Sequence, residues 1–442
     1  MEKLIINGGN RLNGRVRIGG AKNAALPILA ATILAEGEYR ISGLPMLTDI
    51  CTMGELLAQL NISTSCSALS RFCGRDGIST TTQELDSSDL LLVNNDNGSI
   101  IAPFEIVNKM RASILVLGAI LAKRKQAKVA LPGGCAIGER PVDLHISALE
   151  AMGATISVNH GYIEASCDRL KGAEFTFRVV TVTGTENILM AATLAEGVTV
   201  LNNAAKEPEV VDLANFLVAM GAKIKGIGTS RLEIEGVERL HSANYTVMPD
   251  RIEAGTFLCA VAGTGGRLEI ENIPVDSMEA VLLKLQTAGL KITIVDDRHV
   301  IAESDGKMRN IDIETAPYPS FPTDMQAQFM AIMTKADGDS IIDETIFENR
   351  FMHAAELKRM GANITLKGNR AKVRGVKELS GAEVTASDLR ASAGLVIAAL
   401  MASNTSEVHK LQHLDRGYEA FEQKLKAVGA DIVRVKVAKN NE

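Results

Sequence analysis

Two hydrophobic patterns alternate along this chain, and both are typical of helices. The first is amphipathic, and each copy ends in a phrase with glycine at its second position and isoleucine three residues later. Successive copies lie 68, 68, 72 and 68 residues apart, as counted between Gly153, Gly221, Gly289, Gly361 and Gly429. This regularity indicates one supersecondary unit repeated along the chain. Each glycine suits the left-handed position where a helix ends and a strand follows.

A sixth copy of the phrase is degenerate. Asn61 stands in its glycine position, and asparagine is the next-best residue for the left-handed conformation. The distance from residue 61 to residue 153 is 92 residues, which is 24 more than 68 and predicts an insertion. The polar run 63–97 is rich in Ser, Thr and Asp. We expect it to hold the insertion, as a surface excursion without assignable chemistry.

The second pattern is apolar on all sides. Six stretches near residues 22, 111, 185, 251, 324 and 390 are rich in Ala, Leu, Ile and Gly, which predicts buried helices. Segments such as 197–202 and 266–271 predict strands. Six βαβαβ-type units, each with one buried and one amphipathic helix, predict an α/β fold in which sheets enclose helices, with three units per domain. The expected domains are 22–248, which holds the insertion, and 1–21 plus 249–442. Two lobes with two connections suggest a cleft that closes.

Composition narrows the possible functions. The net charge of −6 and an aromatic content of 4% argue against a general nucleic-acid binder. The longest apolar runs are shorter than the roughly 20 residues of a membrane span, so no membrane insertion is expected. The N-terminus lacks the pattern of a signal peptide, which favours a cytoplasmic protein. The six cysteines form no ligand cluster, so we expect no zinc site, no disulfide framework and reduced thiols.

Cations begin four of the six expected buried helices. A cation at a helix N-terminus has the wrong sign for the helix dipole, but it is tolerated where an anion binds between the amides and the side chain. For any one of these cations, solvation or pairing with Asp143, Asp250 or Asp388 is an equally good explanation. Four equivalent cations in a negatively charged chain favour phosphate or carboxylate ligands; they are Lys22, Arg111, Arg251 and Arg390.

One segment combines backbone flexibility with a thiol. Residues 131–145 read Leu-Pro-Gly-Gly-Cys-Ala-Ile-Gly-Glu-Arg-Pro-Val-Asp-Leu-His, and the prolines and glycines exclude a stable helix or central strand. Arg140 lies five residues after Cys135, and a nearby arginine lowers the pKa of a thiol from its reference of about 8.5. The segment is therefore either a lid that carries a proton donor or nucleophile, or a surface turn with an incidental cysteine.

Taken together, the motifs resemble the UDP-N-acetylglucosamine 1-carboxyvinyltransferase family, from the first expected strand to about residue 435. The resemblance rests on the segments that begin at Gly20, Met110, Leu131, Arg140, Phe321, Glu348, Asp388 and Asp415. It implies an inverted α/β barrel of two three-unit domains, with the N-terminal strand in the second domain and the active site in the interdomain cleft. It also implies transfer of the enolpyruvyl group from phosphoenolpyruvate to UDP-N-acetylglucosamine, the first committed step of peptidoglycan precursor synthesis. No cofactor and no metal are implied.

The resemblance also implies roles for individual residues. Cys135 would be the general acid and Asp324 the base, although an aspartate in a first helical turn also stabilises the helix dipole. Lys22, Arg140 and Arg416 would hold the phosphate of phosphoenolpyruvate, Arg390 would lie near its carboxylate, and Asn23 would touch the tetrahedral intermediate. The nucleotide sugar would be held by Arg111, Arg140, Pro141, Val142, Asp143, Leu144, Thr181, Val182 and Ile346. Arg350 would help closure, and His145 is a possible nucleotide contact. Arg251 has no implied role, and a salt bridge is expected for it.

Three alternatives remain open. The related enolpyruvyl transferase that acts on shikimate 3-phosphate lacks the Gly-Gly-Cys loop, so Cys135 discriminates against it. A non-catalytic sensor of the nucleotide sugar would have no need of an acid–base pair. A generic sugar-phosphate scaffold would bind nucleotide without releasing phosphate. One departure from the family pattern is Thr181-Val-Thr-Gly, where some members have Ser-Val-Gly-Ala, so the diphosphate contacts are expected to differ.

Overall fold

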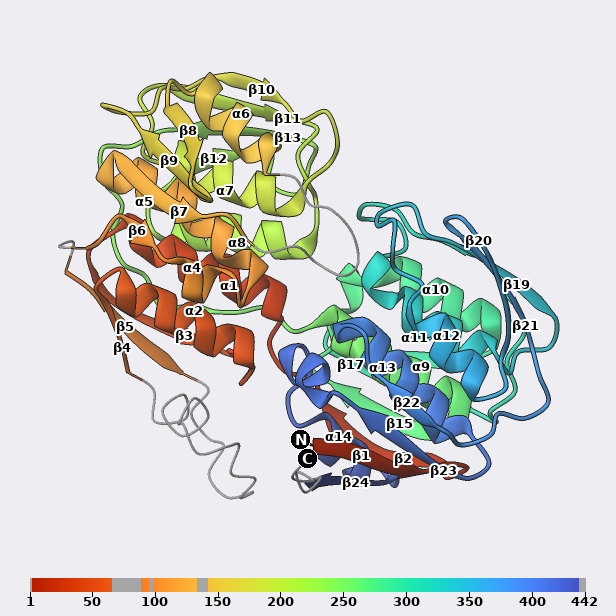
Figure 1. Cartoon of the computed structure of the whole chain (residues 1–442). Helices are drawn as coiled ribbons and strands as arrows, with labels where there is room; N and C mark the ends of the chain where they lie inside the picture. Colours follow the sequence, from red (N-terminus) through yellow and green to blue (C-terminus); the bar gives the residue numbers. More distant parts are fainter. Residues whose placement is uncertain (1, 66–88, 96–97, 133–141, 437–442) are drawn as a thin grey trace. The chain divides into compact units, whose positions relative to one another are not determined.

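The computed structural model describes residues 2–65, 89–95, 98–132 and 142–436. The described chain forms two compact units, coloured along the sequence in Figure 1. One combines the N-terminal stretch up to Gly19 with the chain from Pro249 onward, and the other runs from Gly20 to Met248. The first boundary therefore lies between Gly19 and Gly20 rather than after residue 21.

In its described part, the unit from Gly20 to Met248 contains three four-stranded sheets of the same design. The first strand of each sheet is parallel to the second, and the remaining neighbours are antiparallel. Their strand orders are β14 (Tyr245–Thr246), β3 (Gly37–Ser42), β5 (Leu90–Asn94), β4 (Ile62–Ser65); β6 (Ile101–Ala102), β7 (Gln126–Ala130), β9 (Tyr162–Ser166), β8 (Thr155–Asn159); and β10 (Glu174–Thr176), β11 (Val198–Asn202), β13 (Arg231–Glu235), β12 (Lys223–Lys225).

The other unit repeats this design with strands from both ends of the chain. The N-terminal strand β1 pairs with β24, with Leu4 opposite Arg434, and β2 runs parallel to β15. The strand orders are β2 (Leu12–Arg17), β15 (Gly266–Glu271), β17 (His299–Ser304), β16 (Lys291–Asp296); β18 (Ile313–Glu314), β19 (Asp339–Asp343), β21 (Arg370–Arg374), β20 (Asn363–Lys367); and β22 (Glu383–Thr385), β23 (Thr405–His409), β1 (Glu2–Asn7), β24 (Asp431–Lys436). Six repeated sheet units confirm the α/β repeat predicted from sequence.

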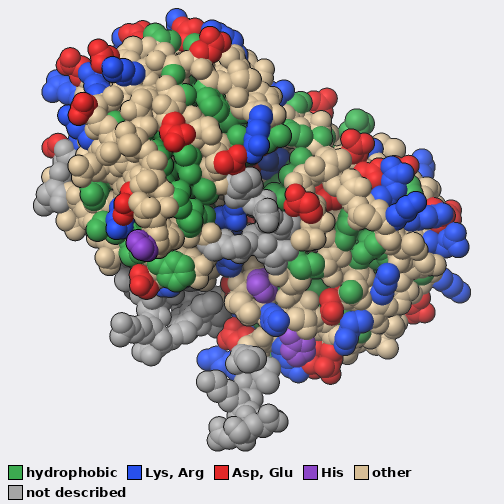
Figure 2. Space-filling view, turned by 45° about the horizontal axis from the view of Figure 1, so that its top comes forward, with side chains coloured by type: hydrophobic (Ala, Val, Ile, Leu, Met, Phe, Trp, Pro, Cys, Tyr) green, Lys and Arg blue, Asp and Glu red, His purple; other side chains and the backbone are tan. Residues whose placement is uncertain are grey.

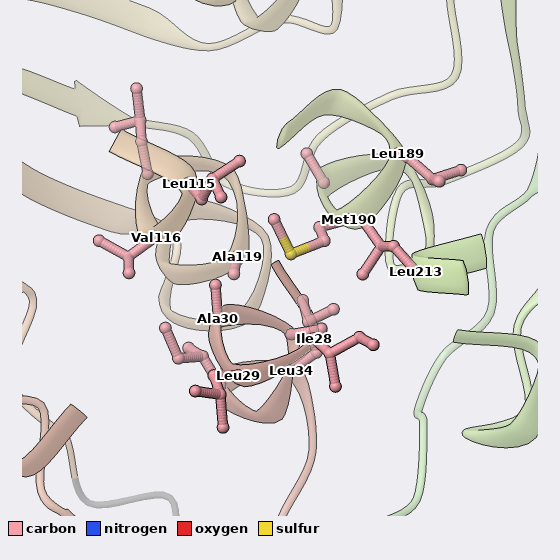
Figure 3. Close-up of a cluster of buried hydrophobic side chains, with 14 of the residues drawn as sticks. Ile28, Leu29, Ala30, Leu34, Leu115, Val116, Ala119, Leu189, Met190 and Leu213 are labelled. Atoms are coloured by element: carbon pink, nitrogen blue, oxygen red, sulfur yellow. The ribbon is translucent and has the colours of Figure 1, made fainter. Parts of the chain in front are cut away.

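The expected all-apolar helices form the core of each unit. In one unit they are α1 (Lys22–Ala31), α5 (Val116–Arg124) and α7 (Val182–Ala192), and in the other α9 (Arg251–Thr264), α11 (Gln326–Met333) and α13 (Leu389–Met401). Figure 3 shows Ile28, Met190 and Val116 among the side chains where α1, α5 and α7 meet. These helices lack a polar face because sheets and other helices cover every side of them.

The amphipathic helices pack around these core helices. They are α2 (Thr48–Gln59), α6 (Asp143–Ala151), α8 (Pro208–Ala219), α10 (Glu279–Ala288), α12 (His353–Arg359) and α14 (Phe421–Ala427). The predicted turn after them is confirmed, because the five repeat glycines have φ between +89° and +113° and Asn61 has φ of 60°. A Cβ at Gly153 would have no neighbouring atom within 4 Å, so only the backbone conformation requires glycine there.

Three expectations need correction. Segment 63–97 is not only a surface excursion, since Leu90–Asn94 forms β5 in the interior of a sheet, with Leu90, Leu92 and Asn94 buried. Arg111 begins a 3₁₀ turn, Arg111–Leu115, and α5 starts only at Val116. Cys51 on α2 is disulfide-bonded, so the expectation of reduced thiols is wrong for this residue, whereas Cys167 and Cys259 are free.

Charged side chains of both signs are interspersed on the face shown in Figure 2. Many form cross-strand pairs, such as Lys223 with Glu235 and Lys291 with Glu303, each at 2.6 Å. Among the described residues, no helix is both long enough and apolar enough to cross a membrane.

Candidate active site

Asp324 is half-buried and lies between two buried arginines in the unit that contains α11 and α13. It belongs to the 3₁₀ turn Thr323–Met325 that leads into α11. Its Oδ1 accepts a hydrogen bond from Nη2 of Arg350 at 2.8 Å, and its Oδ2 accepts from Nε and Nη2 of Arg390 at 3.1 and 2.9 Å. The structure therefore brings together three of the residues predicted for the active site.

The two arginines determine the ionisation of Asp324. Burial alone would raise the pKa of this carboxyl, but the charges of Arg390 and Arg350 and the hydrogen bonds they donate hold its pKa well below the usual range. Burial lowers the pKa of Arg390, but Asp324, Tyr418 and Asp250 outweigh that effect and raise it. In this arrangement Asp324 is a stable anion and a weak base.

Arg390 is placed by its helix and by an aromatic ring. The Asp388 side chain caps α13 by accepting from the amides of Arg390 and Ala391, and the Arg390 guanidinium lies over the ring of Tyr418, 5.5 Å from its centroid. Only 2% of Arg390 is exposed, and its Nη1 is buried with no hydrogen-bond partner among the described residues. An unsatisfied buried donor is consistent with a site for an anionic ligand.

Lys22 begins α1 in the other unit and has a carboxylate partner. Its Nζ lies 3.2 Å from Oδ2 of Asp49 on α2, and both residues are buried. The alternative of an internal pair thus applies to Lys22 and to Arg390, but with Asp49 and Asp324 instead of the carboxylates considered from sequence. Lys22 and Arg390 stay positively charged in these pairs, so both can still bind an incoming anion.

The residues expected to hold the nucleotide sugar are only partly placed for that role. Thr181 caps α7, where its Oγ1 accepts from the amide of Gly184 at 3.2 Å, and Val182 is the first residue of the helix. Asp143 begins α6 and pairs with Arg178. Leu144 does not fit as a side-chain contact, because it is 7% exposed and packs in the core.

His145 is a structural residue and not an exposed nucleotide contact. It is 4% exposed on α6, and its Nδ1 lies 2.9 Å from Nδ2 of Asn187 on α7. Asn187 also donates to the carbonyl of Ile114 and accepts from the amide of Gly118. Burial, aided by the charge of Arg111, lowers the pKa of His145 to about 4, so the imidazole is neutral at pH 7.

The remaining predicted residues fall into two groups. Cys135, Arg140 and Pro141 lie outside the described residues. Asn23 is exposed on α1, Arg111 and Val142 are half-buried, Ile346 is half-buried after β19, and Arg416 ends the 3₁₀ turn Leu411–Arg416.

Two further features concern ligands. Arg251, the first residue of α9, lies over the ring of Tyr318 with its Cζ 5.8 Å from the centroid. Of the residues described, Glu383, Glu407 and His409 bring three potential metal-ligand atoms within 4.8 Å of one another. Lys3 already binds Glu407 at 2.5 Å, so the cluster is satisfied without an ion.

The sequence does not predict several residues that bind Lys22 and Arg350. Asp49 lies 27 positions from Lys22, and Thr323 and Glu344 connect to Arg350 through hydrogen bonds. No local pattern reveals such pairings. The one available signal is a polar residue within a largely apolar helix, such as Asn187 in α7, because a buried polar group requires a partner.

A family comparison decides the class of this protein. The family model for EPSP synthase (3-phosphoshikimate 1-carboxyvinyltransferase) matches residues 6–425. The chain belongs to this family. As a member of the EPSP synthase family it is an enolpyruvyl transferase, which confirms the reaction class expected from the sequence motifs.

Solved structures agree with this family at the level of the fold. The enolpyruvyl transferase NikO from Streptomyces tendae is 22% identical, with a TM-score of 0.85 over 99% of each chain. EPSP synthase from Acinetobacter baumannii is 18% identical, with a TM-score of 0.75 over 99% of this chain and 100% of that one. The repeated α/β architecture is therefore that of the enolpyruvyl transferases.

Proposed function

We propose that this enolpyruvyl transferase acts in the cytoplasm and uses UDP-N-acetylglucosamine as its acceptor. It would join the sugar 3′-hydroxyl to C2 of phosphoenolpyruvate and release phosphate, as the first committed step of peptidoglycan precursor synthesis. The observation that carries this choice is the thiol segment Leu131-Pro-Gly-Gly-Cys-Ala-Ile-Gly. A thiol provides the proton that the methylene carbon must accept, and transferases that use shikimate 3-phosphate lack this segment.

The proposed reaction is an addition followed by an elimination. Cys135 gives a proton to C3 of phosphoenolpyruvate as the sugar oxygen bonds to C2, and Asp324 takes the proton from the sugar hydroxyl. The C2–O bond to phosphate then breaks, the phosphate leaves with the proton held by Asp324, and the Cys135 thiolate takes a proton back from the methyl carbon to restore the double bond. Lys22, Arg140 and Arg416 neutralise the phosphate throughout.

Asp324 must become a better base than it is in the described arrangement. Its pKa is held low by Arg390 and Arg350, so a weaker bond to Arg390 would raise its proton affinity while Arg350 keeps the carboxylate in position. We propose that the carboxylate of phosphoenolpyruvate draws on Arg390, whose buried Nη1 has no partner among the described residues. Substrate binding would then increase the basicity of Asp324 at the moment the hydroxyl arrives.

Most of the residues proposed for the acceptor lie on the unit from Gly20 to Met248. Arg111, Val142, Asp143, Thr181 and Val182 would hold the nucleotide sugar together with Arg140 and Pro141, and Asn23 would contact the tetrahedral intermediate. Ile346 would also contact the nucleotide sugar, and Arg350 would help closure. Leu144 would contribute through its backbone, because its side chain is in the core.

The matching family model describes the enzyme that uses shikimate 3-phosphate, which supports that compound as a second candidate acceptor. Phosphate release from phosphoenolpyruvate should therefore be measured with each acceptor and with none, without added metal. We expect release only with UDP-N-acetylglucosamine. Release with shikimate 3-phosphate alone would establish the second function, and tight nucleotide binding without release would favour a sensor.

A further inference from the structure

Glu344 is a buried hydrogen-bond centre to which the sequence motifs assign no role. It follows β19 and is 2% exposed. Its Oε1 accepts from the hydroxyl of Thr315 at 2.9 Å and from the amides of Ile346 and Phe347 at 2.9 and 3.2 Å. Its Oε2 accepts from the hydroxyl of Thr323 at 2.8 Å. Both oxygens are thus committed within the protein.

The hydrogen bond to Thr323 has only one possible direction. A carboxylate accepts and does not donate, so the Thr323 hydroxyl gives its single hydrogen to Glu344. The same hydroxyl oxygen accepts from Nη1 of Arg350 at 2.8 Å, and Nη2 of Arg350 donates to Asp324 at 2.8 Å. Glu344, Thr323, Arg350 and Asp324 therefore form a continuous hydrogen-bond chain in which every donor is defined.

Glu344 also acts on a second side of Arg350. The guanidinium lies over the ring of Phe347, 5.2 Å from its centroid, and Glu344 binds the amide of that residue. The Glu344 carboxylate thus binds the Thr323 hydroxyl, which accepts from Nη1 of Arg350, and the backbone amide of Phe347, whose ring faces the guanidinium. Arg350 is 5% exposed, so an alternative position in solvent requires the loss of both contacts.

We propose that Glu344 is a positioning residue for enolpyruvyl transfer, acting through the Thr323 hydroxyl to hold Arg350 against Asp324. The inference rests on the proposed roles of Asp324 and Arg350. Correct placement of a charged group by about 1 Å is worth large factors in rate. Loss of the relay should therefore lower kcat more than it changes the KM for phosphoenolpyruvate.

Thr323 offers a matched pair of variants. Thr323→Val keeps the shape but removes the hydroxyl, whereas Thr323→Ser keeps the hydroxyl. We expect kcat to fall about tenfold or more in Thr323→Val, with KM changed less than about threefold, and to stay within about threefold of wild type in Thr323→Ser. Thermal unfolding of both variants identifies any loss of kcat that comes from unfolded protein.

Glu344→Gln tests whether the carboxylate works through this hydroxyl. The amide nitrogen of glutamine donates instead of accepting, so we expect a comparable loss of kcat. In the double variant with Thr323→Val, we expect no more than about a twofold further loss. The proposal would be overturned if the loss of kcat in the double variant equalled the product of the two single losses. A Thr323→Val enzyme as active as wild type would also overturn it. Failure of the wild-type protein to release phosphate would instead overturn the proposed function beneath it.

Discussion

Asp324 shows how a single residue can be both structural and chemical. Its two oxygens bind guanidinium groups that are 6% and 2% exposed in their side chains, on Arg350 and Arg390. Removing one partner of a buried pair leaves an uncompensated charge, which costs far more than the pair itself contributes. The same contacts that lower the pKa of Asp324 should therefore stabilise the fold at neutral pH.

We predict that Asp324→Asn lowers the free energy of unfolding by about 3 kcal/mol at pH 7. The folded pKa of Asp324 lies below the unfolded value of about 3.9, so its contribution is present above that pH and is lost as the pH falls below it. The difference between variant and wild type should accordingly shrink between pH 5 and pH 2. Urea unfolding over this range measures it.

Asp343→Asn is a suitable control for this measurement. Asp343 pairs with Arg370, whose side chain is 60% exposed, and exposed pairs contribute about 0–1 kcal/mol. If Asp324→Asn lost no more unfolding free energy at pH 7 than Asp343→Asn, Arg350 and Arg390 would not depend on Asp324 for their stability in the fold.

Cys135 carries the proposed choice of acceptor, so its chemistry has a separate test. We predict that Cys135→Ser loses most turnover, because a hydroxyl is a much weaker proton donor than a thiol, while binding of UDP-N-acetylglucosamine is retained. Isothermal titration and phosphate release measure the two quantities. We also expect the epoxide fosfomycin to add covalently to Cys135, as peptide mass spectrometry would detect. Addition at Cys167 or Cys259, or none, would contradict the role of the thiol.

The residues themselves were more predictable than their partners. Lys22, Asp324, Arg350 and Arg390 stand in motifs that the sequence displays directly, and three of these four meet in the structure. Their partners depend on tertiary packing: Asp49 reaches Lys22 from another helix, and Asp324 binds Arg390 across 66 positions. The partner of His145 could not be predicted either, because Asn187 on α7 meets it only through tertiary packing.

At the scale of elements, the repeat phrase was a reliable guide because it reports a backbone requirement. A residue at φ near +90° after a helix favours glycine whatever surrounds it, and all five copies adopt this conformation. Elements without such a marker were harder to predict. Strand β5 lay hidden in a polar run, and the 3₁₀ turn at Arg111 has the composition of the helix that follows it.

Gly153 allows the backbone requirement to be measured alone. Its φ is +89° and a Cβ would meet nothing within 4 Å, so Gly153→Ala adds conformational strain without a clash. We predict a loss of about 1 kcal/mol in the free energy of unfolding for Gly153→Ala. Gly153→Asn should lose less, because Asn61 already adopts this conformation at the equivalent position. Equal losses for the two variants would argue against backbone strain as the reason for glycine, and urea unfolding distinguishes these outcomes.

At the scale of the whole molecule, the proposed roles divide between the two units. Lys22, on α1, belongs to the unit from Gly20 to Met248, and Arg416 belongs to the unit that contains α13. The N-terminal strands β1 and β2 join the sheets of the latter unit through pairing with β23, β24 and β15. The chain thus passes from one unit to the other and back, so each unit contributes part of the proposed set of residues.

The proposed phosphate contacts predict that Lys22 and Arg416 of the same chain act in one reaction. Lys22→Ala and Arg416→Ala should each lower turnover about 100-fold or more, because each removes a cation that stabilises the phosphate as it leaves. Co-expression of the two variants should give no more phosphate release than the sum of the separate proteins. If instead two chains of an oligomer shared the residues of one site, mixed assemblies would regain about a quarter of wild-type turnover. Recovery of that size, with each variant inactive alone, would assign the reaction to a site built from two copies of this protein.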